Sequence, residues 1–226
     1  MYDTHIESKE VGDYRYTIYW DEDSENPRSD DTNIFEIFVP KAGRDPRNPM
    51  TEFNDVDSFK YEKATDTKTL KEALDNLREL PNVAVARAIY MYDHSGVSLN
   101  FDAPVDRWDS SFCGFAVVTR ANYRKTHEDK YIEAYKEDLF EEMAEELKVL
   151  SGYISGEVYL FSIEKKVLCD HGIHEWETVE SIGGYYDIDR AREDAEGLIE
   201  YLQKEDLKVS QEELKVSQEE LGHELQ

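Results

Sequence analysis

The chain has 226 residues, 39% of them hydrophobic, and carries 52 acidic against 26 basic side chains, which gives a formal net charge of −26. A chain of this length buries roughly two-thirds of its unfolded surface, enough for one substantial hydrophobic core. So large a negative charge repels phosphate groups and argues against direct binding of nucleic acid. It fits a basic partner, a saline cytoplasm or high solubility, and the bunching of the acids slightly favours the partner.

No stretch approaches the roughly 20 apolar residues that cross a bilayer, and residues 1–5 lack the charged and apolar regions of a signal peptide. We therefore expect a protein that stays in the cytoplasm and does not bind membranes. Cys113 and Cys169 are too few for a disulfide framework and lie in or beside apolar, strand-like sequence. They are expected to be reduced, buried thiols.

Alternating apolar residues predict a half-buried strand over residues 14–20, and an apolar run predicts a second strand over residues 34–39, which ends at Pro40. The turn-rich, acidic residues 21–31 form the loop between them. Residues 41–60 contain two prolines and scattered charges, so we expect an irregular connection.

The centre of the chain predicts a short helix followed by three strands. Thr67 or Thr69 can cap the helix, and Pro81 ends it. Three runs rich in β-forming residues follow, and we expect them to pair as the centre of the sheet: residues 83–92, 97–101 and 112–119.

The last third predicts a long amphipathic helix, a hairpin and a final helix. Apolar residues recur at three- and four-residue steps over residues 132–150, and the helix should end near Gly152. Residues 157–168 and 175–186 are typical of a closing hairpin, and residues 188–203 of a helix.

Together these elements predict an α+β fold, an antiparallel sheet with two or three helices packed mainly on one face. We expect a single domain over residues 1–203 and an acidic repeat tail over residues 204–226, in which Leu-Lys-Val-Ser-Gln-Glu-Glu occurs twice. Ser210 and Ser217 are polar where a coiled-coil seam needs apolar side chains, so a helical or disordered extension is expected.

Four segments carry motifs that can be compared with known families: Asp21–Arg28, Ile89–Val97, Trp108–Phe115 and Gly156–Phe161. Together they resemble a family of uncharacterised proteins from phages and their hosts, which has a Tyr-Asp-His-Ser-Gly and a Trp-Asp-Ser signature. The chain departs from the family where Asp106-Arg107 replaces Cys-Pro and where Gly183 replaces a tryptophan. The resemblance implies a viral or mobile-element accessory protein and supplies no reaction.

Two polar motifs at the ends of neighbouring strands can converge, and they supply the best candidates for a chemical site: Asp93, His94, Ser95, Trp108, Asp109 and Ser110. A histidine beside carboxylates and hydroxyls can act as a general base, and a serine can act as a nucleophile. The alternative is a pair of turns in which these side chains bond to nearby backbone.

A metal site is weighed at Cys169, His171 and His174, which could hold a transition metal together with a further ligand. The set is incomplete, and an incidental pair of histidines in a hairpin turn explains it better. The acidic residues 21–25 lack the glycine and the glutamate of a calcium loop. We therefore expect neither a metal nor another cofactor.

The acidic face of the helix over residues 132–150 is the candidate partner-binding site. Glu133, Glu137, Glu141 and Glu145 follow at four-residue steps, with Glu142 beside them, so the charges repeat about every 6 Å along the helix. This spacing is similar to that of phosphates along a nucleic-acid strand. The alternative is an ordinary solvated helix face.

The leading hypothesis is a counter-defence protein that inhibits a host nucleic-acid-handling complex by offering it an acidic, nucleic-acid-like surface. The alternative is a small enzyme or ligand-binding protein that uses Asp93, His94 and Asp109. An acidic protein of a salt-loving organism and an accessory subunit are further alternatives. A homodimer is left open.

Overall fold

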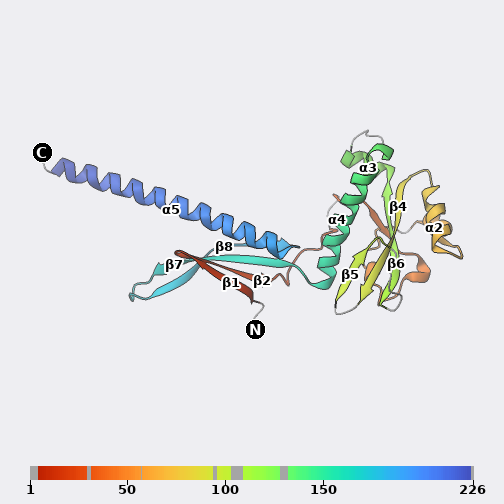
Figure 1. Ribbon diagram of the computed structural model, residues 1–226, viewed down its shortest axis with the longest axis horizontal. Helices are drawn as coiled ribbons and strands as arrows, with labels where there is room; N and C mark the ends of the chain where they lie inside the picture. The colour runs from red at the N-terminus through yellow and green to blue at the C-terminus, as the bar shows by residue number, and fades with distance from the viewer. Residues whose placement is uncertain are drawn as a thin grey trace. The chain divides into compact units, whose positions relative to one another are not determined.

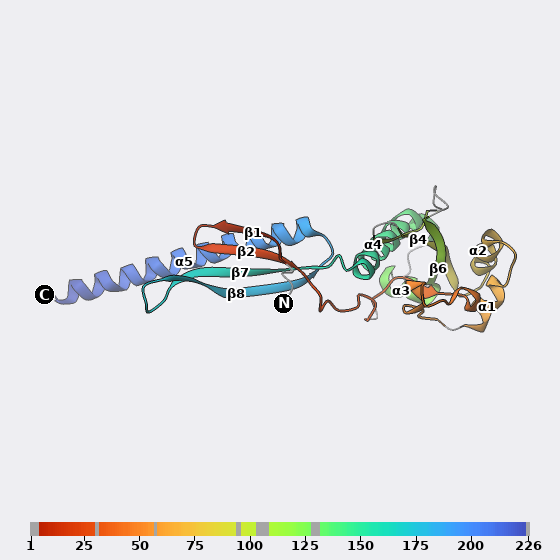
Figure 2. The same ribbon diagram turned by 90° about the horizontal axis from the view of Figure 1, so that it is seen from below.

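The computed structural model shows an α+β fold that divides into two compact units, in place of the single domain expected over residues 1–203 (Figures 1 and 2). Unit 1 consists of Met1–Ser24 and Glu157–Gln226, and unit 2 of Glu25–Gly156. The structure describes six stretches of the chain: residues 5–29, 32–56, 58–93, 96–102, 109–127 and 132–224.

Unit 1 contains an antiparallel sheet with the strand order β1-β2-β7-β8. Its strands are β1 (His5–Val11), β2 (Tyr14–Trp20), β7 (Tyr159–Leu168) and β8 (His174–Tyr185). The period-two pattern of β2 sends Tyr14, Tyr16 and Ile18 to one face, where they are buried. The predicted closing hairpin is confirmed as β7 and β8, whereas β1 is an addition that the sequence does not predict.

Helix α5 (Ile188–Glu224) covers one face of this sheet, as Figure 2 shows. Ala191, Ala195 and Ile199 pack on the apolar side chains of β2 and β7. The helix continues without a break into the expected tail as far as Glu224, so the described part of this extension is helical. Asp206, inside that tail, accepts hydrogen bonds from Tyr14 Oη at 2.8 Å and from Lys165 Nζ at 2.7 Å.

A polar contact joins the end of β2 to the end of β8. Asp21 follows β2 directly, and its Oδ2 accepts a hydrogen bond from the Gly184 backbone N–H at 2.9 Å. A Cβ atom on Gly183 would lie 2.5 Å from this oxygen, and Gly184 has a φ of +80°. The two glycines therefore allow the acidic loop to approach the sheet.

Unit 2 contains a second antiparallel sheet with the strand order β3-β6-β4-β5. Its strands are β3 (Glu36–Phe38), β4 (Val83–Asp93), β5 (Val97–Asn100) and β6 (Ser110–Thr119). The three strands predicted as the sheet centre are found as β4, β5 and β6, but only β6 and β4 are central, and β5 lies at an edge. β3 corresponds to the second predicted strand. β3 is an edge strand with Glu36 at its start.

Helices cover both faces of this sheet, so the expectation that they pack mainly on one face is wrong for unit 2 (Figure 1). α4 (Lys136–Ser155) packs Leu139, Met143 and Leu147 on one face. α1 (Phe59–Thr65) and α2 (Leu70–Arg78) pack on the other face around Phe38 and Phe115. Two different apolar faces of the sheet explain the difference, since successive strand residues point to opposite sides.

Short elements fill the connections in unit 2. The irregular connection over residues 41–60 contains the 3₁₀ turns η1 (Lys41–Gly43) and η2 (Pro49–Thr51), and α3 (Arg120–His127) follows β6 directly. Thr69 caps α2 by accepting a hydrogen bond from the Glu72 N–H at 3.2 Å.

None of the helices in the described part of the chain combines the length and the apolar character that a membrane span requires.

Candidate functional site

Main-chain contacts bring Asp93, Asp109 and Ser110 of the predicted chemical site together. Asp93 ends β4, and its backbone N–H donates a hydrogen bond to the Asp109 carbonyl at 2.8 Å. Ser110 begins β6 and pairs with Tyr92 in the same ladder. His94, together with Ser95 and Trp108 of the same motifs, lies outside the described residues. This contact joins backbone groups alone, so the chemical site and the pair of turns both stay predictions.

Cys169 and His171 lie in the turn between β7 and β8, and His174 begins β8. The Cys169 N–H donates to the Ile173 carbonyl at 2.9 Å, and Gly172, with a φ of +76°, donates to the Cys169 carbonyl. Both cysteines are free, but Cys169 is only partly buried, so the expectation of two buried thiols holds for Cys113 alone. Burial raises the pKa of the Cys113 thiol to about 12, so it behaves as a core side chain. Within the six described stretches, no group of three or more His, Cys, Asp or Glu side chains is placed to hold a metal ion.

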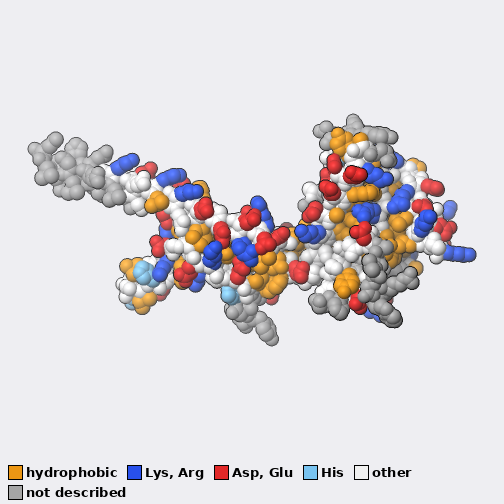
Figure 3. All heavy atoms as spheres, viewed as in Figure 1, with side chains coloured by type: hydrophobic (Ala, Val, Ile, Leu, Met, Phe, Trp, Pro, Cys, Tyr) orange, Lys and Arg blue, Asp and Glu red, His pale blue; other side chains and the backbone are white. Residues whose placement is uncertain are grey.

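The acidic face of α4 is shorter than predicted. α4 begins at Lys136, because residues Ile132–Ala134 form the separate 3₁₀ turn η3, so Glu133 does not continue the helical row. Glu137, Glu141 and Glu145, which we call the α4 acidic row, are exposed. None of the three carboxylates makes a hydrogen bond or an ion pair with another described residue. Figure 3 shows carboxylates over the upper part of α4.

Glu142 faces a different neighbour and does not join this row. Its Oε2 lies 3.0 Å from Nε2 of His127 on α3, and 49% of its side chain is exposed. The His127 ring is buried, stacks on Tyr123 with centroids 4.7 Å apart, and places Nδ1 2.6 Å from Thr126 Oγ1. Glu142 therefore helps to join α3 to α4, and its place in the partner-binding surface stays a prediction.

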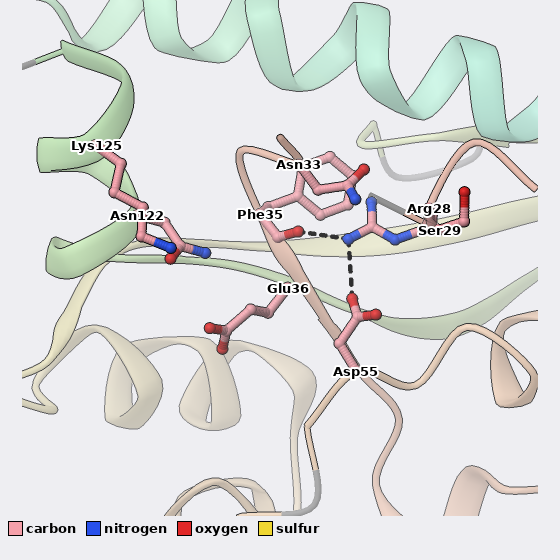
Figure 4. Close-up of a pocket in the computed structure, with 8 residues that line it drawn as sticks. All are labelled: Arg28, Ser29, Asn33, Phe35, Glu36, Asp55, Asn122 and Lys125. Atoms are coloured by element: carbon pink, nitrogen blue, oxygen red, sulfur yellow. Dashed lines mark hydrogen bonds and ion pairs between the residues drawn. The ribbon is translucent and has the colours of Figure 1, made fainter. Parts of the chain in front are cut away.

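A polar hollow of about 320 Å³ lies between β3 and α3 in unit 2 (Figure 4). We call it the Glu36 hollow. The residues that line it are Arg28, Ser29, Asn33, Phe35, Glu36, Asp55, Asn122 and Lys125.

Arg28 forms one wall of the Glu36 hollow and is almost fully engaged there. Only 4% of its side chain is exposed; Nη2 donates to Asp55 at 2.9 Å and to the Phe35 carbonyl at 2.6 Å, and Nη1 donates to Glu146 of α4 at 2.6 Å. The guanidinium also lies 4.9 Å from the centroid of the Phe35 ring. Its Nε is buried and has no hydrogen-bond partner among the residues that the structure describes. This arginine is thus a structural cation that holds two carboxylates in place.

The carboxyl group of Glu36, unlike that of Asp55, is not paired with Arg28. It is half-buried and makes neither a hydrogen bond nor an ion pair within the described part of the chain. Burial raises the pKa of Glu36, the nearby Asp55 carboxylate raises it further, and Arg28 acts in the opposite direction. A carboxyl group in such a place can accept hydrogen bonds from a ligand or exchange a proton with it.

α3 supplies the wall opposite Arg28. In Figure 4 the Glu36 side chain extends from β3 toward this wall, where Asn122 and Lys125 lie. Asn122 is fixed in the first turn of α3, where its N–H donates to Thr119 Oγ1 at 3.1 Å, and the Lys125 side chain is exposed. The hollow therefore offers free carboxylate oxygens inside and one ammonium group at the rim.

Sequence reasoning names Arg28 only as the last residue of the opening motif and does not single out the other lining residues. One local signal marks the hollow: Glu36 is the only charged residue in the apolar run of residues 34–39. A carboxylate inside a buried strand is costly unless it is paired or functional, so this position merits a functional hypothesis.

No protein-family model, curated protein or solved structure matches this chain. The phage-family resemblance therefore stays a prediction that the motif residues alone carry.

Proposed function

We propose that the chain is an acidic counter-defence protein of a virus or mobile element. It binds the basic surface of a host nucleic-acid-handling complex, such as a restriction or CRISPR complex, and excludes nucleic acid from it. The observation that carries the proposal is the α4 acidic row, three exposed glutamates that no described cation neutralises.

The α4 acidic row is separate from the residues that hold the helix. Leu139, Met143 and Leu147 pack on the sheet, so the fold does not depend on the glutamates of the opposite side. A rise of about 1.5 Å per residue places successive glutamates about 6 Å apart. A basic cleft that attracts phosphates attracts this row for the same reason, and the contact releases counterions from both partners.

The wider surface supports attraction to a basic partner. Unit 1 has 26 acidic and 9 basic residues, and unit 2 has 26 acidic and 17 basic residues, so both units are negative. This field steers a basic partner toward the chain at long range. Net charge alone does not fix where the partner binds, and the α4 acidic row supplies that binding site.

The second candidate is a small enzyme or ligand-binding protein that uses Asp93, His94 and Asp109. The observation in its favour is the 2.8 Å main-chain contact that brings Asp93 to Asp109. If Asp93→Ala and Asp109→Ala abolish activity in cells while the protein stays folded, and changes to the α4 acidic row do not, this candidate replaces the first.

Two charge variants test the proposal with equal loss of charge. The α4 variant changes three exposed glutamates to glutamine: Glu137, Glu141 and Glu145. The β8 control variant changes three exposed glutamates of unit 1 in the same way: Glu175, Glu177 and Glu180.

The experiment first captures the partner from a host lysate with the full chain and identifies it by mass spectrometry. The purified partner is then mixed with the chain and with its own nucleic acid. We expect the chain and the nucleic acid to displace each other, and the α4 variant to compete less well than the β8 control variant. Formation of a ternary complex of chain, partner and nucleic acid would contradict the proposal.

A further inference from the structure

In the Glu36 hollow the buried cation is paired, whereas the Glu36 carboxylate is not, and this free carboxylate lies apart from the α4 acidic row. Arg28, its buried cation, already donates to Asp55, Glu146 and the Phe35 carbonyl. The Glu36 carboxylate lies in the same hollow with neither oxygen bonded to a described residue. The Arg28 Nε also lacks a partner, but it is buried, so the free group that a ligand can reach is the Glu36 carboxylate. A hydrogen-bond donor that also carries positive charge gains most from this group.

We propose that the Glu36 hollow binds a guanidinium group, presented by an arginine side chain of the basic partner. The source of the arginine rests on the proposed function, whereas the guanidinium site itself rests on the hollow. The occupant is a cation because Asp55 and Arg28 are already paired with each other, which leaves the Glu36 carboxylate as the unpaired charge inside the hollow.

The geometry favours a guanidinium over other cations. A carboxylate with two free oxygens matches the paired N–H groups of a guanidinium, whereas an ammonium group offers a compact charge without that fork. A metal ion lacks a sufficient ligand set, since no group of three suitable side chains occurs in the described stretches. A volume of about 320 Å³ accommodates one extended side chain.

Lys125 at the rim distinguishes the two sources of a guanidinium. Free arginine carries a carboxylate that the Lys125 ammonium attracts, whereas agmatine has the same guanidinium and lacks the carboxylate. If the occupant is a partner side chain, agmatine should bind at least as well as free arginine. Lys125→Gln should then leave agmatine binding unchanged or strengthen it slightly, because a like charge is removed.

The test measures agmatine and L-arginine binding to the full chain by calorimetry, with Glu36→Gln as the site variant. Glu79→Gln, an exposed glutamate at the end of α2, is the matched control. We expect saturable agmatine binding that weakens at least tenfold in Glu36→Gln and is unchanged in Glu79→Gln. Glu36→Asp, which withdraws the carboxylate by one methylene, should also weaken binding and serves as a second variant.

Partner binding separates this proposal from the proposed function. We expect Glu36→Gln to weaken binding of the captured partner at least fivefold, with its thermal midpoint no lower than that of the wild type. If agmatine does not bind, or binds Glu36→Gln as well as the wild type, the guanidinium site is overturned while the α4 acidic row can still hold the partner. If free arginine binds more tightly than agmatine and Glu36→Gln leaves partner binding intact, the partner arginine is overturned in favour of a free ligand.

Discussion

Arg28 and Glu146 are joined by a 2.6 Å ion pair that fastens the segment before β3 to the inner side of α4. Glu146 also accepts a hydrogen bond from the Ile34 backbone N–H at 2.7 Å. Burial raises the pKa of Glu146, whereas Ile34 and Arg28 act in the opposite direction. The pair therefore positions both Phe35 and the adjacent Glu36, and it links the Glu36 hollow to the helix that carries the acidic row.

Removing the buried cation should destabilise unit 2. Arg28→Met leaves Glu146 and Asp55 without their shared partner, and breaking a buried pair in this way costs about 3 kcal/mol. Arg47→Met is the matched control, because 91% of the Arg47 side chain is exposed in its pair with Asp45. Chemical denaturation of both variants checks this. A loss in Arg28→Met no larger than in the control would show that the network does not hold the fold.

Replacing Glu36 by glutamine should stabilise the protein at neutral pH by about 1 kcal/mol, because a half-buried, unpaired charge is removed. The folded pKa of Glu36 lies above its ordinary value, so this carboxyl stabilises the fold below its ordinary pKa. That contribution is lost as the pH rises through the raised pKa. The difference in thermal midpoint between Glu36→Gln and the wild type should therefore grow from about pH 4 to about pH 7. A constant or shrinking difference would contradict a raised pKa of Glu36 in the folded protein.

The contact between Asp21 and Gly184 should show up as coupling in a double-mutant cycle. Gly183→Ala forces the Asp21 carboxylate away, and Asp21→Ala removes it, so each should cost about 1 kcal/mol through the lost hydrogen bond. Because both changes break the same bond, the double mutant should lose less than the sum of the two. If the losses in unfolding free energy of the two single mutants add up to that of the double mutant, the two changes do not act on the same hydrogen bond.

Truncation can locate the end of the part of α5 that contacts the sheet of unit 1. Cutting after Gln203 removes Asp206 and its bonds to Tyr14 and Lys165, which should lower the thermal midpoint by several degrees. Cutting after Lys208 keeps these bonds and should leave the midpoint nearly unchanged. The same scanning calorimetry measures both. Equal midpoints for the two truncations would restore the sequence-based boundary at residue 203.

Local pattern predicts most elements of the fold, because each carries its own apolar face. β2, β4, β6, α2 and the core-facing side of α4 all follow from the spacing of their apolar residues. β1 does not, since Ile6 and Val11 are its only large aliphatic residues and it becomes a strand by pairing with β2. α1 is too short for a clear period, and α3 begins where β6 ends.

The division into two sheets could not be predicted from local pattern. Alternation shows which side chains share a face but not which strands pair, and β2 pairs with β7 from the other end of the chain. The Glu36 hollow is non-local in the same way, because Arg28, Asp55 and Asn122 come from separate segments. Only Glu36 itself, a charge within an apolar strand, gives a signal that sequence can show.

The salt dependence of partner binding tests the central claim most directly. The affinity of the captured partner for the wild type, the α4 variant and the β8 control variant is measured across a salt series, with the thermal midpoint of each as a folding control. We predict that wild-type binding falls steeply with salt and that the α4 variant binds at least tenfold more weakly. The slope of log affinity against log salt concentration should also become shallower by about 2 to 3, since up to three fewer counterions are released. The β8 control variant should retain most of the wild-type affinity and most of this slope. An α4 variant that keeps the wild-type affinity and salt slope would contradict the account.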